Sequence, residues 1–316
     1  MLQFFGWADR SIPLHTVYER ALERFEVMDE TGYDAVWLAE HHFSGYSVCP
    51  SVHMMATLAA SRTRRMRIGT AVSLAPFYNP LRLAEEVALL DNISGGRVNW
   101  GAGRGFSRAE FEAFGVPVEE SAGRFREAVD VVLNAWTNER LSHAGDYFKF
   151  DNVEVLPKPL QAPHPPVWMA ATSEGAIDWA ASRGFSILMD PHCTRADLAS
   201  KRKLYGERLE ANGFSAEGRD IPMARLIAVA PSAEQAEAVA RRGASWTVGS
   251  YMRGGPGDAD PVERYVNETI VHGTPESVID QIRALQETAQ MNYLLCAPLS
   301  QLSFNLLTDK VLPALG

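Results

Sequence analysis

A short apolar run followed by an amphipathic stretch recurs at intervals of roughly 30 residues along much of the chain. The eight apolar runs lie at residues 2–6, 35–38, 67–74, 97–101, 167–171, 185–189, 224–230 and 293–296. Between them, apolar residues follow helical spacing, as in residues 17–28 and 275–289. Strands that alternate with helices in this way form a parallel sheet. This pattern predicts a (β/α)8 TIM barrel, and a doubly wound open sheet is the main alternative.

Two stretches interrupt this rhythm. Residues 137–166 contain an expected β-hairpin with its turn at 151–152. Residues 249–272 begin with a glycine- and proline-rich segment, 249–261, that is either a surface loop or a lid over a site. We therefore predict one TIM-barrel domain over residues 1–316, with insertions at about 137–166 and 249–272.

The charge and cysteine content exclude several classes of protein. The chain carries 30 basic and 39 acidic residues, a net charge of −9, and has no run of Lys and Arg, which argues against nucleic-acid binding. Its cysteines, Cys49, Cys193 and Cys296, are too few and too scattered for a disulfide framework, as in a reducing compartment. Neither a signal peptide nor an apolar stretch of membrane-spanning length is visible, so we expect a cytoplasmic protein without a membrane partner.

The second apolar run is followed directly by Glu40-His41-His42-Phe43. The carboxyl ends of parallel strands are where α/β proteins place their chemistry. Neighbouring side chains on an extended segment point in opposite directions, so His41 and His42 face different surroundings unless the chain turns between them. An imidazole with its ordinary pKa of about 6.5 can give or take a proton near neutral pH. We expect one imidazole to act as acid or base and the other to be held with Glu40 in a structural hydrogen bond.

A glycine-rich loop, Gly101-Ala-Gly-Arg-Gly105, follows the fourth apolar run. The dinucleotide-binding fingerprint would need a third glycine at the position of Phe106, and it would follow the first strand rather than the fourth. We interpret this loop as bare backbone that a flat or phosphorylated ligand can approach closely. The simpler alternative is a tight turn at the edge of the sheet.

A second feature favours an anionic ligand. Thr172 and Ser173 stand at the start of an expected helix, where free N–H groups and two hydroxyls can bind an anion. The guanidinium of Arg104 can hold two phosphate oxygens at once. Together they predict a monophosphate site. The alternatives are an ordinary helix cap at Ser173 and a salt bridge from Arg104 to Glu110 or Glu112.

These motifs, taken in order, resemble those of the bacterial luciferase-like flavin monooxygenases. They are Glu40-His-His-Phe43, Gly69-Thr-Ala-Val72, Asn79-Pro-Leu-Arg-Leu-Ala-Glu-Glu86, Leu90-Asp-Asn-Ile-Ser-Gly-Gly-Arg97, the glycine-rich loop, Gly273-Thr-Pro-Glu-Ser-Val278 and Val311-Leu-Pro-Ala-Leu315. The resemblance covers nearly the whole chain and implies a TIM barrel that binds reduced FMN, supplied by a separate NAD(P)H flavin reductase. It further implies a reaction with O₂ through a C4a-peroxyflavin that oxygenates an organic substrate, often an aldehyde or ketone. A homodimer formed through helices near the second and third strands is also implied.

The resemblance implies roles for residues near the flavin ring. His41 matches the catalytic histidine of the family. Ala71-Val72 matches a dipeptide joined by a non-prolyl cis bond that supports the isoalloxazine ring. Gly103 stands where bacterial luciferase has a reactive cysteine, so light emission is not expected.

The resemblance also implies residues that bind the FMN phosphate. Arg104 and Arg124 match phosphate ligands, although Arg126 could take the place of Arg124. Ala171, Thr172 and Ser173 match the phosphate loop. Thr172 replaces an acidic residue of the luciferase pattern, and its hydroxyl still suits a phosphate.

A flavin oxygenase needs an apolar mouth that excludes water. Aromatic residues on or beside the strand ends could line it: Trp7, Phe43, Tyr46, Phe77, Tyr78, Trp100 and Phe106. Of these we expect Trp7, Phe43, Phe77 and Phe106 to contact an apolar or aromatic substrate. Ordinary core packing is the alternative, and it is the better interpretation of Trp37 and Trp100.

Other functions remain open at this point. A deazaflavin-dependent dehydrogenase would use the same fold for hydride transfer without O₂. A metal-dependent TIM-barrel hydrolase could draw its ligands from Glu40, His41, His42, Cys49, His53 and His192, although the His-Glu-x-x-His motif is absent and we predict no metal. A flavin-binding relative without activity is a third alternative, and the presence of His41 argues against it.

Overall fold

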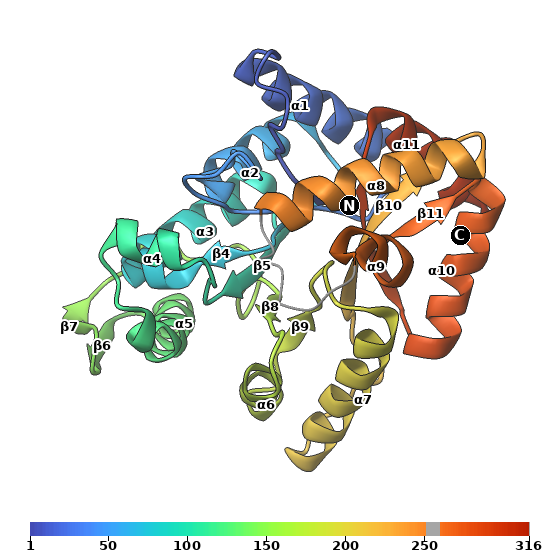
Figure 1. Ribbon diagram of the computed structural model, residues 1–316. Helices are drawn as coiled ribbons and strands as arrows, with labels where there is room; N and C mark the ends of the chain where they lie inside the picture. The colour runs from blue at the N-terminus through green and yellow to red at the C-terminus, as the bar shows by residue number, and fades with distance from the viewer. Residues whose placement is uncertain (251–259, 316) are drawn as a thin grey trace. The chain divides into compact units, whose positions relative to one another are not determined.

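The computed structural model describes residues 1–250 and 260–315, which form two compact units (Figure 1). The N-terminal unit comprises residues 3–5 and 11–170, and the C-terminal unit comprises residues 1–2, 6–10 and 171–316. Each unit is an α/β structure with a parallel sheet. The predicted mobile segment 249–261 lies largely outside the described residues.

The N-terminal unit is built on a parallel sheet. Its strands are β2 (Ala35–Leu38), β3 (Arg67–Thr70), β5 (Val98–Gly103) and β8 (Val167–Ala170), paired in this order. Two short strands join them: β4 (Ser73–Leu74) pairs with β5, and β1 (Leu2–Gln3) places the carbonyl of Gln3 3.3 Å from the N–H of Ala39. The expected strand at 67–74 is therefore interrupted between β3 and β4.

Five α-helices accompany this sheet in the described part of the N-terminal unit. They are α1 (Leu14–Glu30), α2 (Val52–Arg62), α3 (Pro80–Ser94), α4 (Arg108–Phe114) and α5 (Ser121–Thr137). Asn79 caps α3 by accepting the N–H of Leu81 at 3.0 Å, and Pro80 occupies the first turn, where its missing N–H costs nothing. The seven-residue α4 was not predicted, although Ser107 and Gly115 provide recognisable caps.

The hairpin expected in residues 137–166 is present, but its turn is elsewhere. It consists of β6 (Leu141–Ala144) and β7 (Lys149–Val153), so the turn lies at 145–148 and not at 151–152. The reason is Glu127 on α5, whose carboxylate accepts the N–H groups of the turn residues 146–148 at distances from 2.8 to 3.3 Å. A contact to a distant helix thus fixes the turn.

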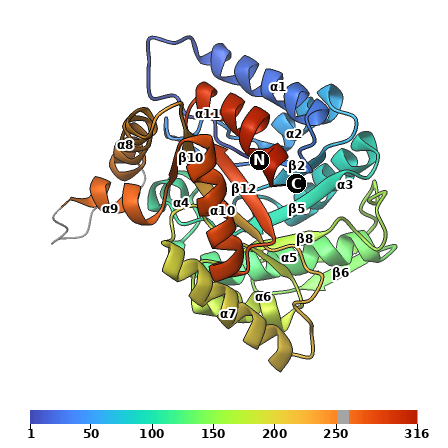
Figure 2. The ribbon, with the colours of Figure 1, turned by 90° about the vertical axis from the view of Figure 1, so that its right-hand side faces the viewer.

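The C-terminal unit contains a second parallel arrangement. β10 (Pro222–Val229) lies between β11 (Val271–Gly273) and β12 (Tyr293–Pro298), and Met189 beside β9 (Ser186–Leu188) bridges to Met223. Helices α8 and α10 pack against this sheet (Figure 2). The helices are α6 (Glu174–Ser182), α7 (Arg195–Ala211), α8 (Ala233–Ser250), α9 (Pro261–Glu268), α10 (Pro275–Ala289) and α11 (Gln301–Leu306), which is followed by short helical turns to Ala314.

The C-terminal part of the expected insertion at 249–272 forms a helix and a strand. It contains α9 and most of β11, neither of which was predicted. Each of the eight predicted apolar runs does contain a strand, and the strands that pair around β3, β5 and β10 are parallel, so the α/β class with parallel pairing is confirmed. A single closed barrel stays a prediction.

Large aromatic side chains fill the core of the N-terminal unit. Trp37 and Trp100 are fully buried, as expected, and Trp37 meets Trp168 edge-on with ring centroids 5.2 Å apart. Gly69 is required beneath Trp37, because a Cβ there would lie 2.3 Å from the indole ring. Among residues 1–250 and 260–315, no helix is both long and apolar enough to cross a membrane.

Candidate functional site

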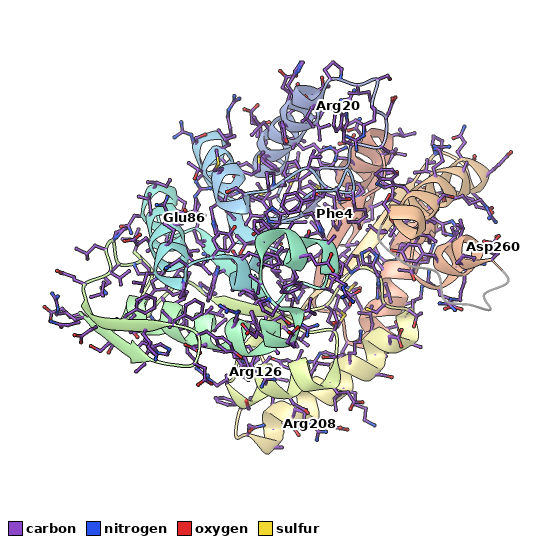
Figure 3. All side chains as sticks on the ribbon, turned by 60° about the vertical axis from the view of Figure 1, so that its left-hand side comes forward. Phe4, Arg20, Glu86, Arg126, Arg208 and Asp260 are labelled. Atoms are coloured by element: carbon purple, nitrogen blue, oxygen red, sulfur yellow. The ribbon has the colours of Figure 1, made fainter. Side chains whose placement is uncertain are left out.

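His41 follows the end of β2 and lies among aromatic rings. Its imidazole stacks on Phe4 with centroids 6.3 Å apart, and it meets Tyr46 edge-on at 5.2 Å and Phe106 at 6.4 Å. Figure 3 shows the position of Phe4. Tyr46 is buried, whereas Phe106 is 53% exposed. His41 is therefore a half-buried imidazole with apolar surfaces around it, open to the side of Phe106.

His42 faces a different environment, as the alternation of side chains predicts. Its Nε2 lies 2.9 Å from Oε1 of Glu40, and its main-chain N–H donates to Oε1 of Glu110 at 2.9 Å. Its ring meets Phe114 edge-on at 4.8 Å. The expected imidazole–Glu40 hydrogen bond is confirmed and belongs to His42, which leaves His41 as the candidate acid or base.

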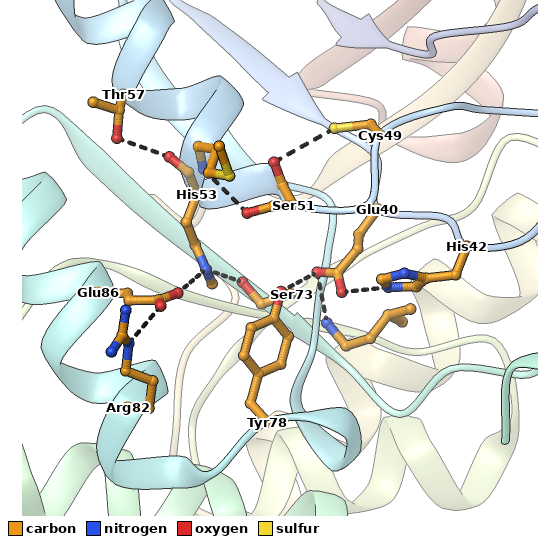
Figure 4. A network of polar contacts seen from close by, with 12 residues as sticks. Glu40, His42, Cys49, Ser51, His53, Thr57, Ser73, Tyr78, Arg82 and Glu86 are labelled. Carbon is orange, nitrogen blue, oxygen red and sulfur yellow. Dashed lines mark hydrogen bonds and ion pairs between the residues drawn. The ribbon is translucent and has the colours of Figure 1, made fainter. Parts of the chain in front are cut away.

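Glu40 ties the end of β2 to the segment around β4 (Figure 4). The carboxylate is 3% exposed, and its Oε2 accepts the N–H of Leu74 at 3.2 Å and the O–H of Tyr78 at 3.0 Å. Burial and the neighbouring Glu40 raise the pKa of Tyr78, so its hydroxyl stays a donor. Burial, with a contribution from Glu40, also raises the pKa of Cys49 to about 12, which leaves a neutral, unreactive thiol.

The peptide bond between Ala71 and Val72 is cis, as the resemblance implies. The N–H of Ala71 donates to the carbonyl of Leu38 at 2.7 Å, which links this dipeptide to the end of β2. Gly103, at the end of β5, lies directly against it. A Cβ at residue 103 would lie 2.3 Å from Cγ2 of Val72 and 3.4 Å from Cβ of Ala170. The absence of a side chain at Gly103 is therefore a steric requirement.

We expect Gly103→Ala to lower the free energy of unfolding by about 1–3 kcal/mol, because the added methyl group forces Val72 or the backbone to move. Urea denaturation measures this. Gly175→Ala on α6 is the matched control, because nothing lies within 4 Å of its Cβ position, and it should be neutral or stabilising. Equal effects of the two substitutions would contradict the steric argument.

Arg104 is exposed on the loop after β5. The two carboxylates considered as its alternative partners are engaged elsewhere: Glu112 pairs with Arg108 at 2.9 Å, and Glu110 accepts the N–H of His42. Within the described part of the chain, neither forms an ion pair with Arg104. This guanidinium is thus available to an anionic ligand.

Arg124 lies in the first turn of α5. Its Nε is 2.7 Å from Oε2 of Glu120, and its guanidinium lies 4.9 Å above the ring of Tyr147. Arg126 is exposed. The guanidinium of Arg124 is therefore held by Glu120 and Tyr147.

The expected phosphate loop belongs to the C-terminal unit. Ser173 caps α6, its hydroxyl accepting the N–H of Ala176 at 3.4 Å, so the simple capping role is present. Thr172 and Ser173 are both exposed, and the N–H of Ala171 donates to the carbonyl of Leu188. Arg104 and Arg124 belong to the other unit. The joint phosphate site stays a prediction.

The four aromatic residues predicted to line a substrate pocket have different neighbours. Phe106 contacts His41. Phe43 is 69% exposed and Phe77 packs on Phe114 at 4.7 Å, and both lie near His42. Trp7 belongs to the C-terminal unit, where the guanidinium of Arg10 lies 4.0 Å above its ring. Phe106 is thus in contact with His41, and the contact of all four residues with a substrate stays a prediction.

Sequence reasoning missed two neighbours of the histidines. Phe4 stacks on His41, and Glu110 holds the main chain of His42 from 68 positions away. Phe4 had a usable signal, because it is an aromatic residue within the first apolar run. Glu110 had none, since it lies in the helix that was not predicted.

A second polar cluster lies in the C-terminal unit. Nδ1 of His192 is hydrogen-bonded to the hydroxyl of Tyr265. The fully buried Arg225 donates to the carbonyls of Pro191 at 3.3 Å and Cys193 at 2.9 Å, and so holds the loop that carries His192. Burial lowers the pKa of His192 to about 4, so it is neutral at pH 7. No sequence pattern indicates a buried arginine here.

Two of the four histidines considered as metal ligands each pair with a single carboxylate. His42 contacts Glu40, and His53 contacts Glu86 at 2.9 Å. In residues 1–250 and 260–315, no group of three or more His, Cys, Asp or Glu side chains is placed to hold a metal ion. A zinc site would need at least three such ligands.

Comparison with known proteins agrees with this geometry. The sequence model of the luciferase-like monooxygenase family matches residues 2–290. The oxygenase component of a flavin-dependent trigonelline monooxygenase from Acinetobacter baylyi is 31% identical over 177 residues, which cover 55% of this chain and 49% of that protein. The chain spans half to about two thirds of the length of the first curated relatives it matches.

Solved structures are similar over greater lengths. The monooxygenase RslO1 from Streptomyces bottropensis superposes with a TM-score of 0.87 at 27% identity, covering 99% of this chain and 98% of its own. An F420-dependent secondary alcohol dehydrogenase shares the fold at 20% identity and a TM-score of 0.79, covering 95% of each chain. The resemblance seen in the sequence is confirmed by the family match over residues 2–290. This chain belongs to the luciferase-like monooxygenase family.

Proposed function

We propose that this protein is the oxygenase component of a two-component flavin-dependent monooxygenase. It would take reduced FMN from a separate NAD(P)H flavin reductase and use O₂ to oxygenate an apolar aldehyde, ketone or aromatic substrate. The observation that carries the proposal is the placement of His41, the Ala71–Val72 cis peptide and the bare Gly103 around the ends of β2, β3 and β5. Family membership and the name of the Acinetobacter relative support it.

The residues at these strand ends suit a flavin. A flavin ring needs an imidazole within reach, which His41 offers, and Gly103 leaves room at the end of β5 for the side chain of Val72. Bound reduced FMN would supply the electrons that activate O₂ for transfer of one oxygen atom to the substrate. His41 would hold or deliver a proton from its imidazole nitrogen. Phe4, Tyr46 and Phe106 would exclude water from that nitrogen.

The proposal includes the finer features that the sequence implied. The strands β1, β2, β3–β4, β5, β8, β9, β10 and β12 would close into one TIM barrel, with their carboxyl ends around the flavin. Arg104, Arg124 and the loop from Ala171 to Ser173 would then bind the FMN phosphate. A crystal structure with FMN bound tests this arrangement, which fails if the phosphate lies away from both guanidiniums.

The function is tested by mixing the protein with reduced FMN without oxygen and then adding O₂. We expect stoichiometric binding of reduced FMN, followed by reoxidation kinetics that differ from those of free FMN. The proposal fails if reduced FMN does not bind, or if it reoxidises as it does in buffer. A parallel titration with a reduced deazaflavin coenzyme tests the dehydrogenase alternative, which predicts tight deazaflavin binding and no use of O₂.

We expect Arg104→Ala to weaken the binding of FMN by about tenfold and that of riboflavin far less, because loss of a charged hydrogen bond to the phosphate costs about 1.5–3 kcal/mol. Titration followed by flavin fluorescence measures both affinities. Arg108→Ala is the control, since Arg108 is exposed and pairs with Glu112 in the next turn. Equal weakening of FMN and riboflavin would mean that Arg104 does not touch the phosphate.

A homodimer through α2 and α3 is part of the proposal. These two helices pack together and expose apolar pairs one turn apart, Met54 with Leu58 and Leu89 with Ile93, which are 44–74% exposed. A second copy of the chain would cover them. Light scattering should give a dimer mass, and Leu89→Glu should shift it towards the monomer. A monomeric wild-type protein would refute the dimer.

A further inference from the structure

A chain of polar contacts runs from the surface of α3 to the residue that follows the cis peptide (Figure 4). Nε of Arg82 lies 2.7 Å from Oε1 of Glu86. The other oxygen of Glu86 lies 2.9 Å from Nδ1 of His53 on α2. Nε2 of His53 lies 3.0 Å from Oγ of Ser73, the residue after Val72.

The order Ser73, His53, Glu86 is that of a hydrolase triad, but a nucleophilic role does not fit. Ser73 has no exposed surface, and His53 is 5% exposed. A nucleophilic hydroxyl must reach a substrate that enters from solvent. The contacts between Ser73, His53 and Glu86 must therefore have a role within the folded protein.

The charge of Glu86 determines which group donates in its hydrogen bond with His53. The hydrogen bond from His53, helped by Arg82, lowers the pKa of Glu86, so this side chain is a carboxylate at neutral pH. A carboxylate only accepts, so Nδ1 of His53 carries a proton and donates it to Glu86. The other ring nitrogen, Nε2, faces the hydroxyl of Ser73, which can either donate or accept a hydrogen bond. Glu86 thereby fixes the orientation of the His53 ring.

The segment after the cis bond is held from two directions. His53 holds the side chain of Ser73 from α2, and Glu40 accepts the N–H of Leu74 from the end of β2. Two imidazole–carboxylate pairs, His53–Glu86 and His42–Glu40, thus flank β4. Because Ser73 directly follows Val72, a fixed Ser73 restricts where the Val72 side chain can lie.

We propose that His53 is a positioning residue of the flavin site. It acts through Ser73 to fix the Ala71–Val72 peptide against Gly103, and so shapes the surface on which the isoalloxazine would rest. Nothing in the sequence motifs points to His53 in this role. The flavin part of this inference rests on the proposed function, whereas the fixing of β4 does not.

Two isosteric substitutions separate the two contacts of His53. An asparagine amide reaches about as far as Nδ1 and keeps the contact with Glu86, whereas a glutamine amide reaches about as far as Nε2 and keeps the contact with Ser73. We expect His53→Asn to weaken FMN binding about tenfold, as a buried hydroxyl loses its partner, and His53→Gln to weaken it less than about threefold. Equal affinities of the two variants would overturn the proposal.

A double-mutant cycle tests whether His53 acts through Ser73. Ser73→Ala should weaken FMN binding as much as His53→Asn does, and the combined variant should be no weaker than either alone. Additive losses would mean that the two residues act independently. Arg82→Gln is the control, because Arg82 is exposed and lies at the far end of the chain of contacts, and it should leave FMN affinity unchanged.

Hydrogen exchange in the flavin-free protein gives a result that does not depend on FMN. Amide exchange in residues 68–78 should be faster in His53→Asn than in His53→Gln, at comparable unfolding midpoints, because each variant loses one hydrogen bond. Equal exchange would overturn the positioning role. If the wild-type protein binds no FMN, the proposed function fails, and this measurement alone decides whether His53 fixes β4.

Discussion

Replacement of His41 by alanine should lower the turnover of substrate about 10²–10⁴-fold while the protein stays folded, because removing a positioned general acid or base has an effect of this size. The imidazole lies outside the strands, after the end of β2, and makes edge-on and stacking contacts with Phe4, Tyr46 and Phe106. Steady-state kinetics with a substrate identified by oxygen consumption measure the loss.

The FMN affinity and the thermal unfolding midpoint of the His41→Ala variant should be measured beside its turnover. Both should change little in His41→Ala, since neither a strand hydrogen bond nor the phosphate contacts are removed. His15→Ala is the matched control, because His15 is exposed near the start of α1. Unchanged kcat/KM in His41→Ala would remove His41 from the mechanism, and a large loss of FMN binding would make it a flavin-binding residue instead.

Glu40→Ala should have the largest effect on stability, lowering the free energy of unfolding by about 3–5 kcal/mol. The substitution leaves three donors without their acceptor: the N–H of Leu74, the hydroxyl of Tyr78 and the His42 side chain. The carboxylate and the amide of Leu74 are buried, so water cannot replace the lost contacts without rearrangement. Urea denaturation measures the change.

Glu40→Gln is the matched comparison. The amide oxygen can still accept from Leu74 and Tyr78, so we expect a loss of only about 1–2 kcal/mol. Tyr78→Phe removes a single donor and should cost less than Glu40→Ala. If alanine and glutamine at this position destabilise the protein equally, the hydrogen bonds of Glu40 are not what holds β2 to β4.

The parts of the fold that the sequence predicts are those with local causes. The strand at 35–38 and the helices at 174–182 and 275–289 have the predicted bounds, because apolar spacing and nearby caps determine them. The different surroundings of His41 and His42 also have a local cause, because neighbouring side chains on an extended segment point in opposite directions. Helix α9 had a readable start in Asp260-Pro261, a cap followed by proline at the first position, which the glycine-rich surroundings obscured.

The parts that escaped prediction depend on contacts between distant residues. The hairpin turn lies where Glu127 accepts its N–H groups, 19 to 21 positions away. His53 meets Ser73 across 20 positions, and nothing in either residue's neighbours signals it. Strand β11 has only three residues, too few to show a period. The candidate site was thus predictable in its motifs but not in the contacts that hold them.

The contact between Gly103 and Val72 has a consequence for how this site can change during evolution. Any side chain at residue 103 meets Cγ2 of Val72. A larger residue at position 103 should therefore destabilise the protein less when residue 72 has already become smaller. Val72→Ala followed by Gly103→Ala passes through a folded intermediate, whereas the reverse order passes through a strained one. Relatives with a larger residue at 103 should therefore carry a smaller one at 72, and libraries that vary either position should vary both.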